Sequence, residues 1–168
     1  MRIVKNGDVH VSAPLGTSRQ TVMDFIERNR NWISQARKRM EQQLDTRADF
    51  YAQLPLATKA EREEATLRME ALIQPLVNSY AKTMGVHPRQ VSYKAIRSYW
   101  GKCLVKTHDI IFSYYLLLMP EWCVEQVVVH ELAHLIVANH GPRFHALMDR
   151  YFPRWREARA EMRRVVRA

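Results

Sequence analysis

The most constraining feature of this chain is a strongly apolar segment, residues 122–138, with polar side chains at its centre. Pro120 in front of it is typical of the first position of a helix, so we expect a helix over 122–138. Apolar residues on every side of a helix indicate that the helix is buried. His130, Glu131 and His134 would then lie in the core, where polar groups without a partner cost several kcal/mol. The fold must therefore enclose this helix and supply a partner for these side chains.

A metal ion is the partner that this spacing favours. His130 and His134 are four residues apart in an H-E-x-x-H pattern, so they share one helix face and can bind the same ion. Neutral imidazole suits Zn²⁺, at a Zn–N distance of about 2.0–2.1 Å. Glu131 is rotated by about 100° from His130, which places it beside the ion rather than on it. Two core histidines satisfied by protein groups remain the alternative without a metal.

His140 is the expected third ligand. An unbroken helix would carry it about 9 Å beyond His134 and onto another face, so the helix must end before it. Asn139 tolerates a left-handed cap, and Gly141-Pro142 cannot extend a helix. Three histidine ligands leave one position open for water, as in catalytic zinc sites. We therefore expect a zinc-activated water, with Glu131 as general base and then as general acid.

Periodicity, capping patterns and turn residues predict the other elements. In chain order, these are a hairpin at residues 2–5 and 9–13 around Asn6-Gly7, a helix over 18–44, a helix from Thr58 to about Thr83 that Pro75 bends or interrupts, strands at 91–97 and 103–113, a helix over 142–151 and a terminal helix after Pro153. The segment 103–113 is one strand or two short strands joined by a turn at Thr107-His108-Asp109. Thr17 and Gln20 form the capping box of the first long helix, in which we expect Trp32 to anchor the core.

These elements predict an α+β fold, in which a small antiparallel sheet and an N-terminal hairpin pack against helices. The length of 168 residues and a composition of 47% hydrophobic and 26% charged residues predict a single globular domain over 1–168. No signal-peptide pattern opens the chain, and no apolar run approaches the roughly 20 residues of a membrane span. We therefore expect a cytoplasmic protein without a membrane partner; no sequence feature indicates an oligomeric state.

The formal charge of +9 is unevenly distributed. Residues 1–50 carry +3, residues 51–142 carry +1 and residues 143–168 carry +5, where all the basic side chains are arginines. Such an end can attract phosphates or an acidic partner. The favoured interpretation is a solvated helix face, since Trp155, Ala158, Met162 and Val165 recur at helical spacing and can dock on the core.

Three other side chains with chemical potential are expected to have ordinary roles. Cys103 and Cys123 are too few for a disulfide framework, and no neighbouring residue suggests a lowered thiol pKa, so we expect buried small hydrophobic residues. His145 is expected at the surface, with a substrate contact or a spare ligand as alternatives.

Two sequence blocks resemble the YgjP-like metallopeptidases, relatives of the SprT-like zincins. The most specific block is VVVHELAHLIVANHGPRFHALMDRYFP, and a second is Ser98-Tyr99-Trp100-Gly101-Lys102-Cys103. The opening GDVHVSAPLGTSRQTVMDFIERNRNWI is also similar to the family. The resemblance implies a zincin-like domain and a hydrolase with zinc on His130, His134 and His140 and Glu131 as catalytic base.

The chain departs from the family pattern at three places, none of them an expected ligand or base. Lys102 replaces the usual Ser, Phe112-Ser113 stands where a Leu-Asn pair is common, and His145 stands where Trp is frequent. Lys102 adds a cation close to Trp100.

Four functions fit these features. The leading hypothesis is a zinc metallopeptidase acting on a peptide or protein. A metal-dependent nucleoside triphosphate pyrophosphatase or phosphohydrolase is the alternative, because an activated water also attacks phosphorus and the Arg-rich end can hold phosphates. A DNA-associated SprT-like protease would add a nucleic acid partner, bound in a salt-sensitive way. A zinc-stabilised binding module is disfavoured, because structural zinc sites fill all four positions with protein ligands.

Overall fold

The structure of this chain, a computed structural model, describes residues 1–4 and 7–167. Contacts along the chain divide it into two units, Met1–Ala48 and Asp49–Ala168. The main hydrophobic core begins at Phe50 and belongs to the second unit, as do the three expected histidine ligands. In the part of the chain that the structure describes, no helix combines the length and the apolar character needed to cross a membrane.

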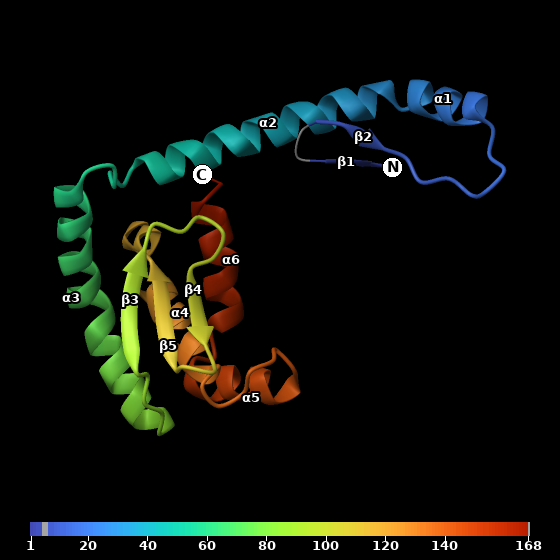
Figure 1. The fold of residues 1–168 in the computed structure, drawn as a ribbon. Helices are drawn as coiled ribbons and strands as arrows, with labels where there is room; N and C mark the ends of the chain where they lie inside the picture. Colours follow the sequence, from blue (N-terminus) through green and yellow to red (C-terminus); the bar gives the residue numbers. More distant parts are fainter. Residues whose placement is uncertain (5–6, 168) are drawn as a thin grey trace. The chain divides into compact units, whose positions relative to one another are not determined.

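The first unit opens with the expected hairpin (Figure 1). Strands β1 (Arg2–Ile3) and β2 (Val9–His10) pair antiparallel. Asn6 of the expected turn lies outside the described residues, whereas Gly7 has a φ of 84°, which glycine adopts without strain. The Arg37 guanidinium donates a 2.9 Å hydrogen bond to the Gly7 carbonyl, which ties the following helical segment to the hairpin.

The single helix predicted over 18–44 is wrong, because two helices cover this region. They are α1 (Arg19–Arg28) and α2 (Arg30–Ala52). Asn29 separates them, and its side-chain amide donates a 2.8 Å hydrogen bond to the Phe25 carbonyl. Such local side-chain bonds to the backbone are the reason why Asn favours helix ends over helix interiors.

The cap of α1 and the position of Trp32 also differ from the predictions. Ser18 is the N-cap, accepting a 3.1 Å hydrogen bond from the Thr21 N–H, while Thr17 precedes the helix. Trp32 is 43% exposed, so its predicted role as a core anchor is wrong. The neighbouring residue Ile33 is buried instead. A new helix, α2, starts after Asn29, and it places Ile33 rather than Trp32 on its buried side.

The first helix that lies wholly in the second unit is the long helix α3 (Lys59–Met84), whose predicted capping box is confirmed. Thr58 Oγ1 accepts a hydrogen bond from the Glu61 N–H, and the Glu61 carboxylate accepts one from the Thr58 N–H. Pro75 does not interrupt α3, because it lies on the exposed side. Gly85 ends the helix in the left-handed conformation at φ 68°, as expected for a glycine cap.

The sheet of the second unit is mixed, so the prediction of an antiparallel sheet is only partly correct. Its strands are β3 (Gln90–Lys94), β4 (Gly101–Leu104) and β5 (Asp109–Ser113), in the order β3-β5-β4. β4 and β5 form an antiparallel hairpin, but β5 runs parallel to β3. The connection over 95–100 leaves a gap one strand wide, and β5 fills that gap.

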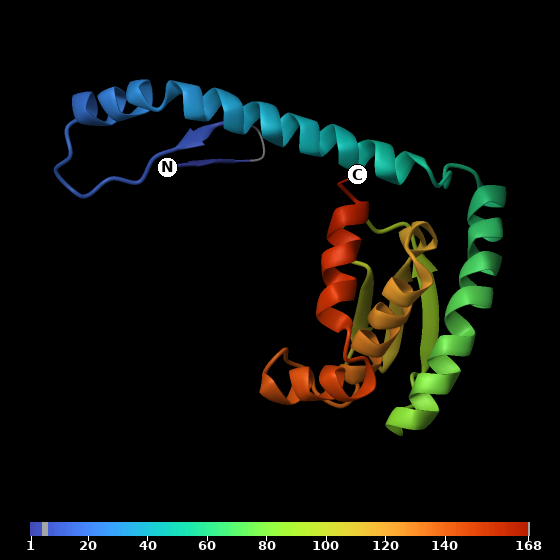
Figure 2. The same ribbon diagram turned by 180° about the vertical axis from the view of Figure 1, so that it is seen from behind.

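Four helical segments follow the sheet, and α4 is the central one. They are η1 (Tyr114–Leu118), α4 (Glu121–Ala133), α5 (Pro142–Tyr151) and α6 (Trp155–Val165). Figure 2 shows α4 and α6 on the same face of the sheet, and α4 packs against β4, α3, α5 and α6. Most of α4 is buried, as its apolar sequence predicts. Pro120 is its N-cap rather than its first residue.

The C-terminal end of α4 differs from the prediction. The helix ends at Ala133 rather than near Ala138, with His134 as its cap. The Ala133 carbonyl accepts hydrogen bonds from the N–H groups of Ile136 and Val137, at 3.0 and 2.9 Å, so the chain leaves the helix through a tight turn. Apolar residues therefore continue beyond the helix into a loop, in which Ile136 is 41% exposed.

Helix α6 agrees with the interpretation of the basic end as a docked amphipathic helix. Trp155, Ala158 and Met162 are buried on one side of it. Two of its arginines pair with acidic neighbours, Arg156 with Asp149 and Arg164 with Glu161.

Candidate metal centre

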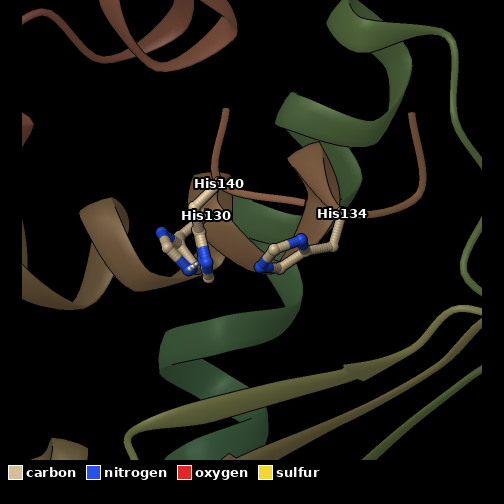
Figure 3. A group of neighbouring side chains, drawn as sticks. All are labelled: His130, His134 and His140. Atoms are coloured by element: carbon tan, nitrogen blue, oxygen red, sulfur yellow. Dashed lines mark hydrogen bonds between the residues drawn. The ribbon is translucent and has the colours of Figure 1, made fainter. Parts of the chain in front are cut away.

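The three expected ligands come together around one point. His130 and His134 lie at the end of α4, and His140 lies in the loop before α5, with the three rings gathered as Figure 3 shows. One ring nitrogen of each histidine lies within 4.8 Å of the others. His130 Nε2 and His140 Nε2 are 3.0 Å apart.

This spacing fits a tetrahedral ion. Ligand nitrogens about 2.05 Å from a zinc ion at tetrahedral angles are about 3.4 Å from one another. The distance of 3.0 Å between His130 Nε2 and His140 Nε2 is slightly below that value. The other nitrogen–nitrogen distances are at most 4.8 Å, and rotation of the side chains can shorten them to the tetrahedral value. The donor set of three imidazoles is also one that zinc accepts. The residues therefore fit the metal that the sequence predicts.

The protein environment keeps the two helix histidines neutral, which is the form that binds a metal. Burial lowers the pKa of His130 to about 3, with the neighbouring His134 and His140 adding to the effect. Burial also lowers the pKa of His134. His134 Nδ1 lies 3.3 Å from the Val137 carbonyl, so a proton on Nδ1 leaves Nε2 free as the ligand atom. The turn after α4 therefore orients one of the ligands.

Phe144 supports all three imidazoles. It lies in the first turn of α5 and is 2% exposed. Its ring centroid is 4.8 Å from that of His130 and 4.7 Å from those of both His134 and His140. A single buried ring thus limits the rotation of three side chains from two different segments.

Glu131 is buried beside the histidines, in contact with the sheet. It is 5% exposed, and burial raises its pKa to about 8, whereas a hydrogen bond from the Cys103 backbone acts in the opposite direction. A Cβ atom at Gly101 would lie 2.6 Å from Glu131 Cγ and Oε1. A positive charge at the three histidines would favour the ionised carboxylate. Helix α4 thus presents two imidazoles to one point and a carboxylate to strand β4.

Comparison with known proteins places the chain in a family. The model of the YgjP-like family, described as a metallopeptidase domain, matches residues 1–57 and 55–165. The chain belongs to the YgjP-like metallopeptidase family. The resemblance found in the sequence is therefore confirmed, and the three histidines and Glu131 all lie in the second matched segment.

A solved structure is similar to part of this YgjP-like chain. It is the crystal structure of the metallopeptidase zymogen of Pyrococcus abyssi abylysin, with a TM-score of 0.50 and 20% identity. The match covers 54% of the YgjP-like chain and 90% of the abylysin chain. At this identity, the likeness shows a shared fold. No curated protein matches the chain.

The sequence analysis missed three contributors to the centre of this YgjP-like protein. Phe144 and Gly101 each lie in a block that resembles the family, but nothing in their spacing shows that they touch the histidines or Glu131. The Val137 carbonyl belongs to a turn that the predicted helix hid. Contacts between distant segments carry no periodic signal, so only the family blocks could have directed attention to them.

The remaining candidates lie outside the group of three histidines. His145 is half-buried rather than fully at the surface, and it stacks on Trp155 with centroids 5.4 Å apart. Burial raises the pKa of Cys103 and of Cys123 to about 11, so neither thiol is a ready nucleophile, as expected. Lys102 is exposed, and strand alternation directs it away from the sheet face that carries Gly101 and Cys103.

Proposed function

We propose that this protein is a zinc-dependent metallopeptidase, in which His130, His134 and His140 hold the ion and Glu131 is the general base. The observation that carries the proposal is the approach of three imidazole nitrogens to within 4.8 Å of one another. Two of them come from the end of α4, which also buries the Glu131 carboxylate, and the third comes from the loop before α5. Membership of the YgjP-like metallopeptidases supports a metal and a peptide substrate. The choice of zinc follows from the three-imidazole donor set.

Each residue has a separate task in this proposal. When bound, zinc lowers the pKa of a coordinated water to about 7 and polarises the substrate carbonyl. Glu131 accepts the proton of the attacking water and then delivers it to the leaving amine nitrogen. His134 is kept in one tautomer by the Val137 carbonyl, and Phe144 limits the motion of the rings. The backbone of α4 keeps the carboxylate and two of the imidazoles at a constant spacing.

Strand β4 suits an extended peptide as substrate. In the described sheet it is an edge strand, because β5 lies between it and β3. An edge strand offers free backbone N–H and C=O groups that an extended peptide can pair with. Gly101 of this strand contacts Glu131, so a peptide paired with β4 would pass close to the carboxylate.

A nucleotide or nucleic acid substrate has less support. The chain belongs to a metallopeptidase family, and the arginines of α6 partly pair with acidic neighbours such as Glu161 and Asp149. We therefore propose a peptide bond as the target.

The test compares zinc-loaded wild type with Glu131→Gln on casein and on a panel of nucleoside triphosphates. We expect the wild type to cleave casein and the variant to be about 10²–10⁴-fold slower, because it keeps the size of the side chain but loses the proton acceptor. His145→Ala is the matched control, since His145 lies outside the three-histidine group, and it should keep the activity. Cleavage of nucleotides with casein left intact would contradict the proposal and favour a phosphohydrolase.

A further inference from the structure

Gly101 is the place on the sheet where the Glu131 side chain fits. A Cβ atom there would lie 2.6 Å from Cγ and Oε1 of Glu131 and 2.8 Å from Cδ. Real Cβ contacts are essentially never below 3.0 Å. Gly101 is not among the glycines with positive φ, so its backbone is one that other residues adopt. Close approach of the carboxylate, not backbone freedom, is therefore what requires glycine at this position.

The surroundings hold the backbones of both partners, β4 and α4, in place. Trp100 precedes Gly101, and its carbonyl accepts a 2.8 Å hydrogen bond from the Ser113 N–H. Gly101 itself pairs with Phe112, which is completely buried. On the other side, Glu131 is 5% exposed and its helix neighbour Leu132 is completely buried, so α4 is packed at this point. A side chain added to the strand would therefore displace the carboxylate.

We propose that Gly101 is a positioning residue for the Glu131 carboxylate. The absence of a side chain in β4 creates the space that the carboxylate occupies. This inference rests on the proposed function for its consequence in catalysis. The contact itself is a property of the folded chain and can be tested without a substrate.

The first test measures the thermal unfolding of the metal-free protein. Gly101→Ala should lower Tm by about 4–8 °C, the shift expected in a chain of this size when a filled site is overpacked to a typical extent. In a Glu131→Ala background the atoms that collide with the new Cβ are gone, so the same change should lower Tm by less than about 2 °C. Equal losses in both backgrounds would overturn the inference, because strand β4 alone would then account for them.

The second test follows catalysis by the zinc-loaded protein. Gly101→Ala should bind zinc at the wild-type ratio, since no ligand changes, but its kcat should fall about 100-fold with little change in KM, the cost typical of a reacting group displaced by about 1 Å. Gly141→Ala is the control for the glycine-to-alanine change, because a Cβ there meets nothing within 4 Å. Full activity of Gly101→Ala would overturn the inference. A wild type inactive on every peptide, with the Tm coupling present, would overturn the proposed function and leave the contact standing.

Discussion

Removal of one histidine ligand should weaken the stabilisation that zinc gives to the fold. A ligand that binds only the native state stabilises it by about 4.1 kcal/mol when its free concentration is 1,000 times Kd. For a protein of this size, that corresponds to a Tm increase of about 8–16 °C. His134→Ala leaves His130 and His140, whose nitrogens are 3.0 Å apart, as a two-ligand site.

The expected loss follows from the affinity of that remaining pair. Changes to the outer partners of metal ligands already cost 10–100-fold in affinity, so loss of a ligand itself should cost at least about 100-fold. At the same zinc concentration, the stabilisation then falls to about 1.4 kcal/mol, or a Tm increase of about 3–6 °C. Each Tm shift is the difference between zinc-loaded and chelated samples of the same variant. The destabilisation caused by a cavity at the missing ring is present in both samples and therefore does not contribute to the shift.

The assay is differential scanning fluorimetry with a zinc titration, supported by zinc quantification after dialysis. His145→Ala is the matched control, because it removes an imidazole that stacks on Trp155 outside the three-histidine group. It should retain the full zinc-induced shift. A wild type without a zinc-induced shift, or a His134→Ala variant with the wild-type shift, would refute the assignment of the metal centre.

Two further predictions concern the surroundings of α4. Phe144→Leu keeps an apolar residue but removes the ring that contacts all three imidazoles. Zinc affinity, measured in competition with a chelating dye, should therefore fall about 10–100-fold. Unchanged affinity would show that Phe144 only fills the core. Burial and the hydrogen bond to Glu125 raise the pKa of Tyr80 to about 12. Because the folded-state pKa exceeds the usual value of about 10, the stabilisation from this hydroxyl is complete below pH 10 and disappears as the pH rises through 12. Urea unfolding of the wild type and Tyr80→Phe should therefore converge over this range, and a gap that widens with pH would contradict the assignment.

The sequence predicted which side chains meet better than it predicted the shape of the segments around them. Histidine spacing and the need for a chain break before His140 follow from helix geometry, and the structure does bring the three side chains together. The break comes at Ala133 instead of near Ala138, where the N–H groups of Ile136 and Val137 bond to the Ala133 carbonyl in a turn and Ile136 is 41% exposed. Over such a short stretch, hydrophobicity does not report backbone conformation.

The pairing between strands could not be predicted from the sequence, for a different reason. Alternation identified the regions of β3, β4 and β5, and the turn at Thr107–Asp109 identified their hairpin. The alternation of polar and apolar residues does not show that β5 lies next to β3. That pairing depends on which strand of the β4–β5 hairpin is placed beside β3. The contact between Gly101 and Glu131 is hidden in the same way, since it joins a strand to a helix that is distant in sequence.

The central position of α4 has a consequence for how this protein loses its structure. Ile110 and Phe112 are completely buried in the same core cluster as the apolar residues of α4, so the sheet and α4 depend on each other for their burial. The amide protons of α4 should then exchange with solvent only when the whole second unit unfolds, whereas those of the loop around His140 can exchange by local opening. Two of the three histidines therefore belong to the most slowly exchanging part of the chain and the third to a more labile one.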